Sequence, residues 1–229
     1  MKRILGVVVT CMATQVASAQ VGYPPARSPY VDVDQTQELT TFIGYFSAKH
    51  DPAKVAPIGG VLGGFQYEWR AGGPAFLGMD LMAVNSTRTP QDPSLAVASR
   101  SLGSRANALY AGDVFFALSL TGDRSWHHLI PMTNFGIGLI TDAKNPDVGG
   151  FQFGTKLTIP WGVGIRWVPG GGHLQVRADM RDWLYPISYP EGYYISTTAA
   201  PPILSSTTPR SKWGNNFAMT LGMSYVFAH

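Results

Sequence analysis

The histidines are the first residues to examine for chemistry, because a histidine can act as a general base or bind a metal. There are five of them: His50, His127, His128, His173 and His229. Nucleophilic catalysis needs a serine or cysteine within hydrogen-bonding reach of such a base, and a zinc site needs several ligands close together. None of the five lies in a recognisable motif of either kind. The sequence therefore predicts no catalytic residue, no metal site and no cofactor, and it leaves a Ser–His lipid hydrolase as the enzymatic alternative.

A second set of chemically capable residues consists of charged side chains inside segments that are otherwise apolar. The acids are Glu68, Asp80, Asp113 and Asp179, and the bases are Lys156, Arg166, Arg177 and Arg181. If these segments are strands that share one interior, the charges must pair, because an unpaired buried ion costs several kcal/mol. We therefore expect a polar plug, a lumen charge network. The alternative is that the same residues line a narrow aqueous path or bind an ion.

Period-two alternation predicts the strands that would hold these charges. In His173–Tyr185, apolar residues occupy one face and Gln175, Arg177, Asp179 and Arg181 the other. The same alternation runs through Lys156–Trp167 and Phe217–Phe227, where the second face carries small or polar residues. One polar face and one apolar face are typical of a β-strand that separates a polar environment from an apolar one. Pro160 interrupts the pattern and predicts a bulge or an unpaired edge at that point.

Five weaker segments bring the predicted number of strands to eight, the even number that bacterial barrels require. The connections after the first, third, fifth and seventh strands are long and those between them are short, as in an up-and-down barrel with both termini on one side. The longest connection is residues 186–212. The weaker segments are Glu38–Lys49, Gly60–Arg70, Phe76–Asn85, Asn107–Leu120 and Leu129–Ile140.

The N-terminus predicts export. Lys2 and Arg3 precede an apolar run, and Ala17-Ser18-Ala19 supplies the small-x-small pattern of a signal peptidase site. We expect residues 1–19 to be a signal peptide cleaved after Ala19, and residues 20–37 to be an irregular periplasmic lead before a barrel of residues 38–229. Without residues 1–19 the basic and acidic residues nearly balance, so the charge that nucleic-acid binding needs is missing.

Composition favours an all-β membrane protein over a soluble one. The chain is 45% hydrophobic and only 14% charged, which is a poor composition for a soluble surface. It also has no run of 18 apolar residues, which a transmembrane helix would need. An eight-stranded antiparallel up-and-down transmembrane β-barrel resolves the conflict, because its apolar residues alternate along the strands. A soluble exported barrel or sandwich is the alternative.

Aromatic residues gather near the predicted strand ends. Membrane barrels carry such residues in girdles at both interfaces, and we expect that role here. The tyrosines at 185–194 could instead form a ligand-stacking cluster in the long loop. The residues concerned are Tyr67, Trp69, Trp126, Trp161, Trp167, Trp183, Tyr185, Tyr193 and Tyr194.

The C-terminal strand carries the most specific motif. Residues 220–227 read TLGMSYVF, and Gly222, Tyr225 and Phe227 match the spacing of an outer-membrane assembly signal, followed here by Ala228 and His229. Together with the hairpin of residues 162–182, this segment resembles OmpA-like outer-membrane β-barrel domains. The resemblance implies insertion by the barrel-assembly machinery, in a family that ranges from structural anchors and adhesins to small channels.

These observations lead to one expectation about function. We expect a monomeric, non-enzymatic protein of the bacterial outer membrane with a structural or surface-interaction role. Its expected partners are outer-membrane lipid and lipopolysaccharide, with an extracellular ligand at the 186–212 loop. A small channel for small or apolar solutes is the main alternative, and an outer-membrane lipid hydrolase is the second.

Overall fold

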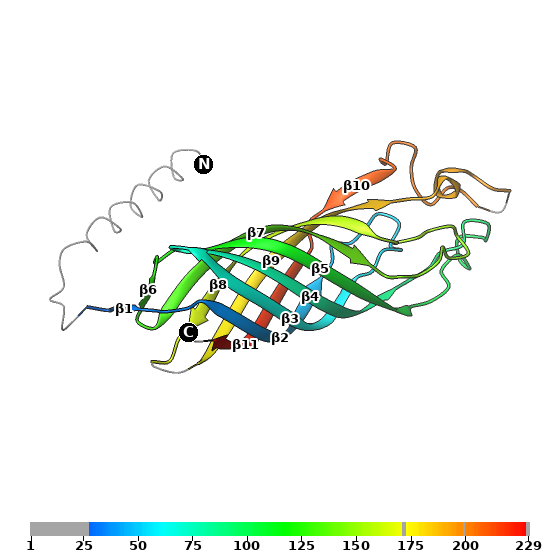
Figure 1. Ribbon diagram of the computed structural model, residues 1–229. Helices are drawn as coiled ribbons and strands as arrows, with labels where there is room; N and C mark the ends of the chain where they lie inside the picture. The colour runs from blue at the N-terminus through cyan, green and yellow to red at the C-terminus, as the bar shows by residue number, and fades with distance from the viewer. Residues whose placement is uncertain (1–27, 171–172, 199, 228–229) are drawn as a thin grey trace, which may run out of the picture.

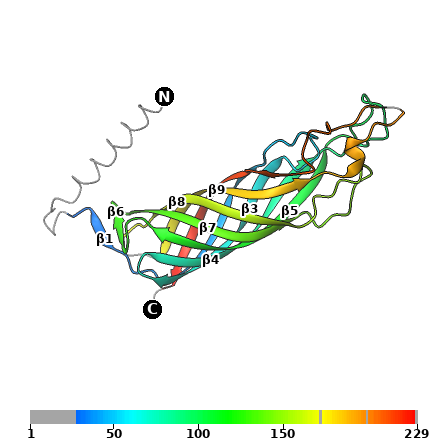
Figure 2. The same ribbon diagram turned by 90° about the horizontal axis from the view of Figure 1, so that it is seen from above.

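In the computed structural model, residues 28–170, 173–198 and 200–227 are described. The chain forms a closed antiparallel barrel of eight strands (Figures 1 and 2). Each strand pairs with its neighbours along the chain, and the last barrel strand closes on the first over residues 37–47 and 217–227. The barrel strands are β2 (Gln37–Ser47), β3 (Gly59–Gly72), β4 (Ala75–Arg88), β5 (Arg105–Ser119), β7 (Leu129–Thr141), β8 (Lys156–Trp167), β9 (Leu174–Ser188) and β11 (Phe217–Phe227).

Three short strands and one 3-10 helix extend the barrel at its two ends. β1 (Tyr30–Asp32) pairs with β6 (Arg124–Trp126), and β10 (Ser211–Gly214) continues the sheet beside β9. The helix η2 spans Glu191–Tyr194. In Figure 1, β1, β6 and the last residues of β11 lie at one end, which we call the termini end, and β10 and the long connections lie at the other, the loop end.

The all-β class, the eight strands and the up-and-down order predicted from alternation are confirmed. All eight predicted segments coincide with observed strands, with boundaries displaced by three residues or fewer. The expected signal peptide, residues 1–19, and the start of the expected lead lie outside the described residues. Within the described part of that lead, Tyr30–Asp32 forms β1 and Gln37 belongs to β2.

Pro160 disturbs the sheet differently from the prediction. The β7–β8 ladder stops at Phe135↔Trp161 and resumes at Gly138↔Thr158 in the same register, while Pro160 still faces Trp183 on β9. A proline has no N–H to donate, so the ladder is interrupted on one side only. The predicted bulge or edge is therefore wrong at this position. A closed barrel has no edge, and the register does not shift.

The outward face of the eight strands is almost uniformly apolar. Exposed side chains include Ile43, Phe65, Leu81, Phe135 and Leu221, each more than half exposed. β11 has 11 residues, which at about 3.3 Å per residue and a strand tilt of about 40° give an apolar height of about 28 Å. Among the described residues, no helix is both long and apolar enough to cross a membrane.

The expected aromatic girdle is corrected at three positions. Trp69, Trp126, Trp161 and Trp167 are on the outside, between 36% and 48% exposed. Trp183, Tyr185 and Tyr193 are instead buried. For Trp183 and Tyr185 the reason is that the alternation of β9 continues without a break from Gln175 to Ile187, so the odd-numbered positions all face the lumen. Trp213 on β10, which the prediction omitted, is 52% exposed.

Candidate functional site

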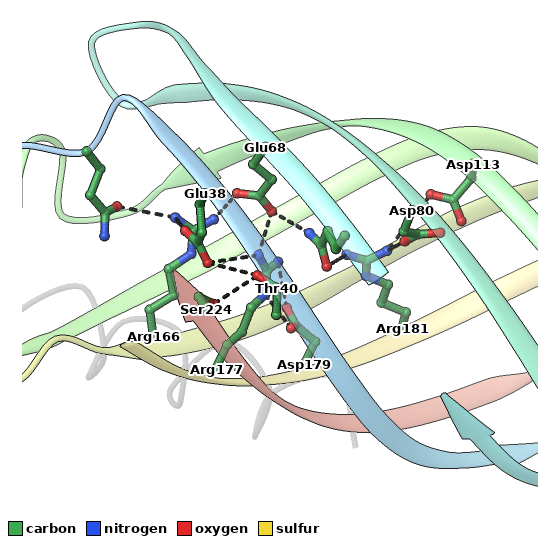
Figure 3. A network of polar contacts seen from close by, with 12 residues as sticks. Glu38, Thr40, Glu68, Asp80, Asp113, Arg166, Arg177, Asp179, Arg181 and Ser224 are labelled. Carbon is green, nitrogen blue, oxygen red and sulfur yellow. Dashed lines mark hydrogen bonds and ion pairs between the residues drawn. The ribbon is translucent and has the colours of Figure 1, made fainter. Parts of the chain in front are cut away.

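The interior of the barrel at the termini end holds the lumen charge network (Figure 3). Its members are the buried residues Glu38, Glu68, Asp80, Asp113, Arg166, Arg177, Asp179 and Arg181. They come from β2, β3, β4, β5, β8 and β9, and each occupies an inward position of its strand. The structure thus brings together seven of the eight predicted residues and adds Glu38.

Glu68 is the carboxylate on which two arginines converge. It forms ion pairs with Arg166 and with Arg177, whose Nη1 lies 2.5 Å from Glu68 Oε1. It also accepts a hydrogen bond from the side-chain amide of Gln66. Glu38 supports the same pair of arginines, since its Oε2 lies 2.9 Å from Arg166 Nη1. The four side chains form one connected cluster of alternating sign.

These ion pairs cross the full bore of the barrel. β3, which carries Glu68, and β8, which carries Arg166, are four strands apart in either direction around the closed sheet. The same holds for Asp80 on β4 and Arg181 on β9, which also form an ion pair. In an eight-stranded barrel the interior is just wide enough for side chains to fill. The charges therefore tie opposite walls together.

Arginine stacking and glycines complete the packing around the guanidinium groups. Arg166 lies over the Phe76 ring at 5.0 Å and Arg181 over the Phe115 ring at 4.7 Å. Gly78 makes room for the Phe115 ring, because a Cβ at Gly78 would lie 2.3 Å from it. Such stacking adds a favourable cation–π term to a desolvated guanidinium.

Asp80 and Asp113 form a pair of facing carboxyl groups at the boundary of the network. They face each other directly across β4 and β5 on the inward side. Arg181 contacts Asp80 closely but lies 3.9 Å from Asp113 Oδ1, and the second partner of Asp113 is the neutral Trp183 Nε1 at 3.2 Å. The Oδ1 atoms of both aspartates are buried without a hydrogen bond in the described part of the chain.

A hydroxyl chain links the network to β11. Thr40 Oγ1 donates to Glu38 Oε1 at 3.1 Å and lies 2.8 Å from Ser224 Oγ. Because the Thr40 hydrogen is used on Glu38, Ser224 is the donor to Thr40. Asp179 closes the opposite side, with its two oxygens 2.5 and 3.0 Å from Arg177 Nε and Nη2. Alternation along β2 places Glu38 beside Thr40 on the inward face, which is the signal that could have identified Glu38 from sequence.

Lys156 is the predicted member that lies apart. It stands at the loop end of β8, on the inward side but only half-buried, and within the described residues it forms no ion pair. The position at the strand end explains this, because the arginines and carboxylates of the network lie nearer the middle and the termini end of their strands.

The other half of the lumen is apolar. Strand residues such as Phe46, Leu62, Leu109, Ile140 and Tyr185 pack there against side chains from the connections. Those connections contribute chiefly Ala53, Val55, Phe151, Phe153, Tyr189, Tyr193 and Leu204. We call this cluster the apolar cap. The network occupies the termini end and the middle of the bore, and the apolar cap occupies the loop end.

Hydrogen bonds hold the long connections onto the apolar cap. Arg88 pairs with Asp147 at 3.1 Å and stacks on Phe151 at 5.5 Å. Gln91 donates to the Ala53 carbonyl at 2.7 Å, and Arg100 to the Pro201 carbonyl at 2.6 Å. The loop end is thus a tied assembly of all four long connections. Burial raises the pKa of the Tyr193 hydroxyl, with the nearby Asp147 charge adding to the effect.

The residues of the predicted assembly signal lie on the final strand, β11. Tyr225 and Phe227 point outward, 46% and 41% exposed, while Gly222 faces the lumen. Tyr225 stacks on the His173 ring at 5.5 Å. Across the described residues, no group of three or more His, Cys, Asp or Glu side chains is arranged to hold a metal.

No family model matches this chain, and no curated protein matches it.

Proposed function

We propose that this chain is a monomeric eight-stranded barrel of the bacterial outer membrane, OmpA-like in kind, with a structural or surface-interaction role and no enzymatic activity. The barrel-assembly machinery inserts it, and outer-membrane lipid and lipopolysaccharide surround it. The observation that carries the proposal is the inverted polarity of the barrel, with charge inside and apolar side chains outside. A soluble protein has the opposite distribution.

The outward face of the eight strands supports a position in a membrane, because its single charged residue is buried. Across the eight strands, Asp182 is the one charged side chain at an outward position, and it is 2% exposed. Its Oδ1 accepts from the Asn216 backbone N–H at 2.7 Å and its Oδ2 from Asn215 Nδ2 at 2.5 Å. A charge facing hydrocarbon is costly, and this arrangement removes the charge from the outer surface.

Heat-modifiability tests the proposal directly. The protein extracted from an outer-membrane fraction is run on a detergent gel with and without boiling. We expect the unboiled sample to migrate differently, because a closed barrel resists unfolding by detergent at room temperature. Recovery in a soluble periplasmic fraction without such a shift would contradict the proposal.

A matched pair of arginine substitutions sharpens the test. Leu81 lies in the middle of β4 and is 67% exposed, and Val97 lies in a long connection and is 63% exposed. An arginine facing the bilayer midplane costs about 2–4 kcal/mol, so Leu81→Arg should reduce membrane insertion while Val97→Arg should not. Equal insertion of the two variants would favour a soluble barrel.

The proposal includes a lumen that does not conduct. Ion pairs between opposite strands and the apolar cap occupy the bore in series. In planar bilayers we therefore expect no steady single-channel conductance from the unaltered protein. Discrete conductance steps that change when Arg177 or Arg181 is neutralised would favour the alternative of a small channel.

Surface interaction is assigned to the loop end. Tyr189 and Tyr193 are buried in the apolar cap, so they are not available to stack on a ligand. The exposed apolar side chains there include Val97, Val148 and Ile195 in the connections and Trp213 on β10. We therefore expect an extracellular ligand at the 186–212 loop to contact Ile195 and Trp213. Replacing both residues with aspartate should abolish binding of this extracellular ligand to whole cells that carry the protein. The shift of the protein on a detergent gel should not change.

A further inference from the structure

A cavity of about 270 Å³ opens at the termini end of the barrel. It lies between the β1–β6 pair and the mouth formed by β9 and β11. Its wall is made by Val31, Asp32, Val33, Asp34, Ser125, His128, Val168, Gly170, His173, Gln175 and Val226. The volume is close to the lower end of the range for small-molecule sites.

The inner wall of this cavity carries a buried acceptor without a donor. Gln175 is 2% exposed, and its Oε1 has no hydrogen-bond partner in the described part of the chain. A buried acceptor left unpaired is costly, so its donor is expected to come from a ligand. Gln175 stands opposite Ser224 in the β9–β11 register, and Ser224 leads through Thr40 to Glu38. The cavity therefore meets the lumen charge network at this point.

Two histidines add acceptors to the same cavity. His128 Nδ1 lies 3.1 Å from the Val168 carbonyl oxygen, and His173 Nδ1 lies 2.9 Å from that of Val226. A carbonyl only accepts, so Nδ1 carries the hydrogen in each neutral ring and Nε2 is left as an acceptor. His127 and His128 have φ of 49° and 64° because they form the two-residue turn between β6 and β7, and this turn places His128 at the cavity.

The charge around the cavity is negative. Asp34 lines it and is exposed, while Asp32 is paired with Arg124 at 2.8 Å. Among the described residues, the Asp34 carboxylate and the unpartnered Gln175 Oε1 thus offer a ligand one anion and one buried acceptor, which a cationic donor would complement.

We propose that the cavity binds a small organic cation with a primary ammonium group, which donates to Gln175 Oε1 and is held by the Asp34 carboxylate. The ammonium group has three donors and no acceptor, and a group of this kind on a short aliphatic chain matches both the volume and the apolar part of the wall, Val31, Val33, Val168 and Val226. The site is separate from the loop end, where the proposed surface contacts lie.

Isothermal titration of the purified full chain in a zwitterionic detergent tests the site with three four-carbon probes. Putrescine carries two ammonium groups, 1,4-butanediol replaces them with hydroxyls, and succinate replaces them with carboxylates. We expect putrescine to bind at least tenfold more tightly than the diol and succinate to show no binding. Equal affinities, binding of succinate, or binding of Mg²⁺ in place of putrescine would overturn the proposal.

Variants then locate the binding. Gln175→Leu removes the buried acceptor and should weaken putrescine about tenfold, because a hydrogen bond to a charged group is among the stronger ones. Asp34→Asn changes an exposed residue, so it should fold normally and weaken binding about two- to fivefold. Glu191→Gln removes one negative charge in the same way but at the loop end, so it should leave the affinity for putrescine unchanged. Unchanged affinity in Asp34→Asn, or an equal loss in Glu191→Gln, would refute this site even if Gln175→Leu failed to fold.

Discussion

The two halves of the lumen fill the same bore with opposite chemistry. At the termini end, three arginines and five carboxyl groups lie together, and the ion pairs of Glu68 with Arg166 and of Asp80 with Arg181 join opposite strands. At the loop end, aromatic and aliphatic side chains from the strands meet those of the connections. The charged half is built almost wholly from strand residues, whereas much of the apolar cap comes from loops. We therefore expect the charged half to unfold only together with the barrel. The apolar cap, in contrast, should be able to open locally while the barrel stays folded.

The largest expected effect is at Glu68. Replacing Glu68 with alanine leaves Arg166 and Arg177 short of their shared partner in a desolvated interior. Breaking a buried ion pair on one side costs about 3–5 kcal/mol, so we expect the free energy of unfolding in detergent to fall by that amount. Urea titration followed by tryptophan fluorescence measures it.

The control for Glu68 is Glu191→Ala, which removes an exposed acid paired with Arg210 at 3.2 Å. Exposed pairs contribute about 0–1 kcal/mol, so this variant should unfold like the parent. A loss below about 1 kcal/mol in Glu68→Ala would mean that the charged half tolerates orphaned arginines, and the contrast between the halves would disappear.

The matching experiment in the apolar cap is Phe153→Ala. Phe153 lies in the connection before β8, is 1% exposed, and meets the Tyr185 ring edge-on at 5.7 Å. Truncating a buried phenylalanine costs about 3–5 kcal/mol where the site cannot collapse. Because Phe153 belongs to a loop, we expect its truncation to cost about 3 kcal/mol, the lower end of this range, and to open the apolar cap locally.

Limited proteolysis distinguishes local opening from global unfolding. In Phe153→Ala, residues 142–155 should become sensitive to protease while the protein still shifts on a detergent gel. Gln152→Ala, at an exposed neighbouring position, should remain resistant. Loss of the gel shift in Phe153→Ala would show that the cap and the barrel unfold as one unit.

This difference between the halves also explains what the sequence could predict. Alternation along β8 and β9 placed Arg166, Arg177, Asp179 and Arg181 on one face, because a strand has a fixed period and an eight-stranded bore leaves one interior for that face. Such reasoning needs no knowledge of the connections. It extends equally to Glu38, which shares the inward face of β2 with Thr40.

The apolar cap could not be predicted in the same way. Phe151, Phe153 and Tyr193 lie in connections without periodicity, so no pattern indicates which of them turn inward. Tyr193 was expected at an interface because it follows the predicted end of a strand, but it lies buried in the apolar cap. Lys156 shows the complementary limit, because its position on the inward face was correct but alternation does not report depth along the bore.

A smaller effect is expected at the two facing aspartates. Asp80 holds Arg181, whereas Asp113 has Arg181 only at 3.9 Å and a neutral donor in Trp183. Asp80→Asn should therefore cost about 2 kcal/mol and Asp113→Asn less than about 1 kcal/mol, since asparagine can still accept from the indole N–H. Urea titration of both variants decides this. An equal or reversed order would mean that Asp113 carries the charge that Arg181 needs.

The smallest expected effect is at Tyr193, and it concerns pH. The Tyr193 hydroxyl is buried without a hydrogen-bond partner among the described residues, so Tyr193→Phe should change the free energy of unfolding by no more than about 0.5 kcal/mol at pH 8.

Burial raises the pKa of Tyr193 above its ordinary value of 10.0. A group whose pKa is raised by folding stabilises the folded state fully at pH values below its pKa in the unfolded protein. That contribution is lost as the pH rises from the pKa of the unfolded protein toward the pKa of the folded protein. Between pH 8 and pH 11 the parent should therefore lose more stability than Tyr193→Phe. Tyr189, whose pKa burial also raises, remains in both proteins and limits the difference. Identical pH profiles would show that the apolar cap opens to water before Tyr193 ionises.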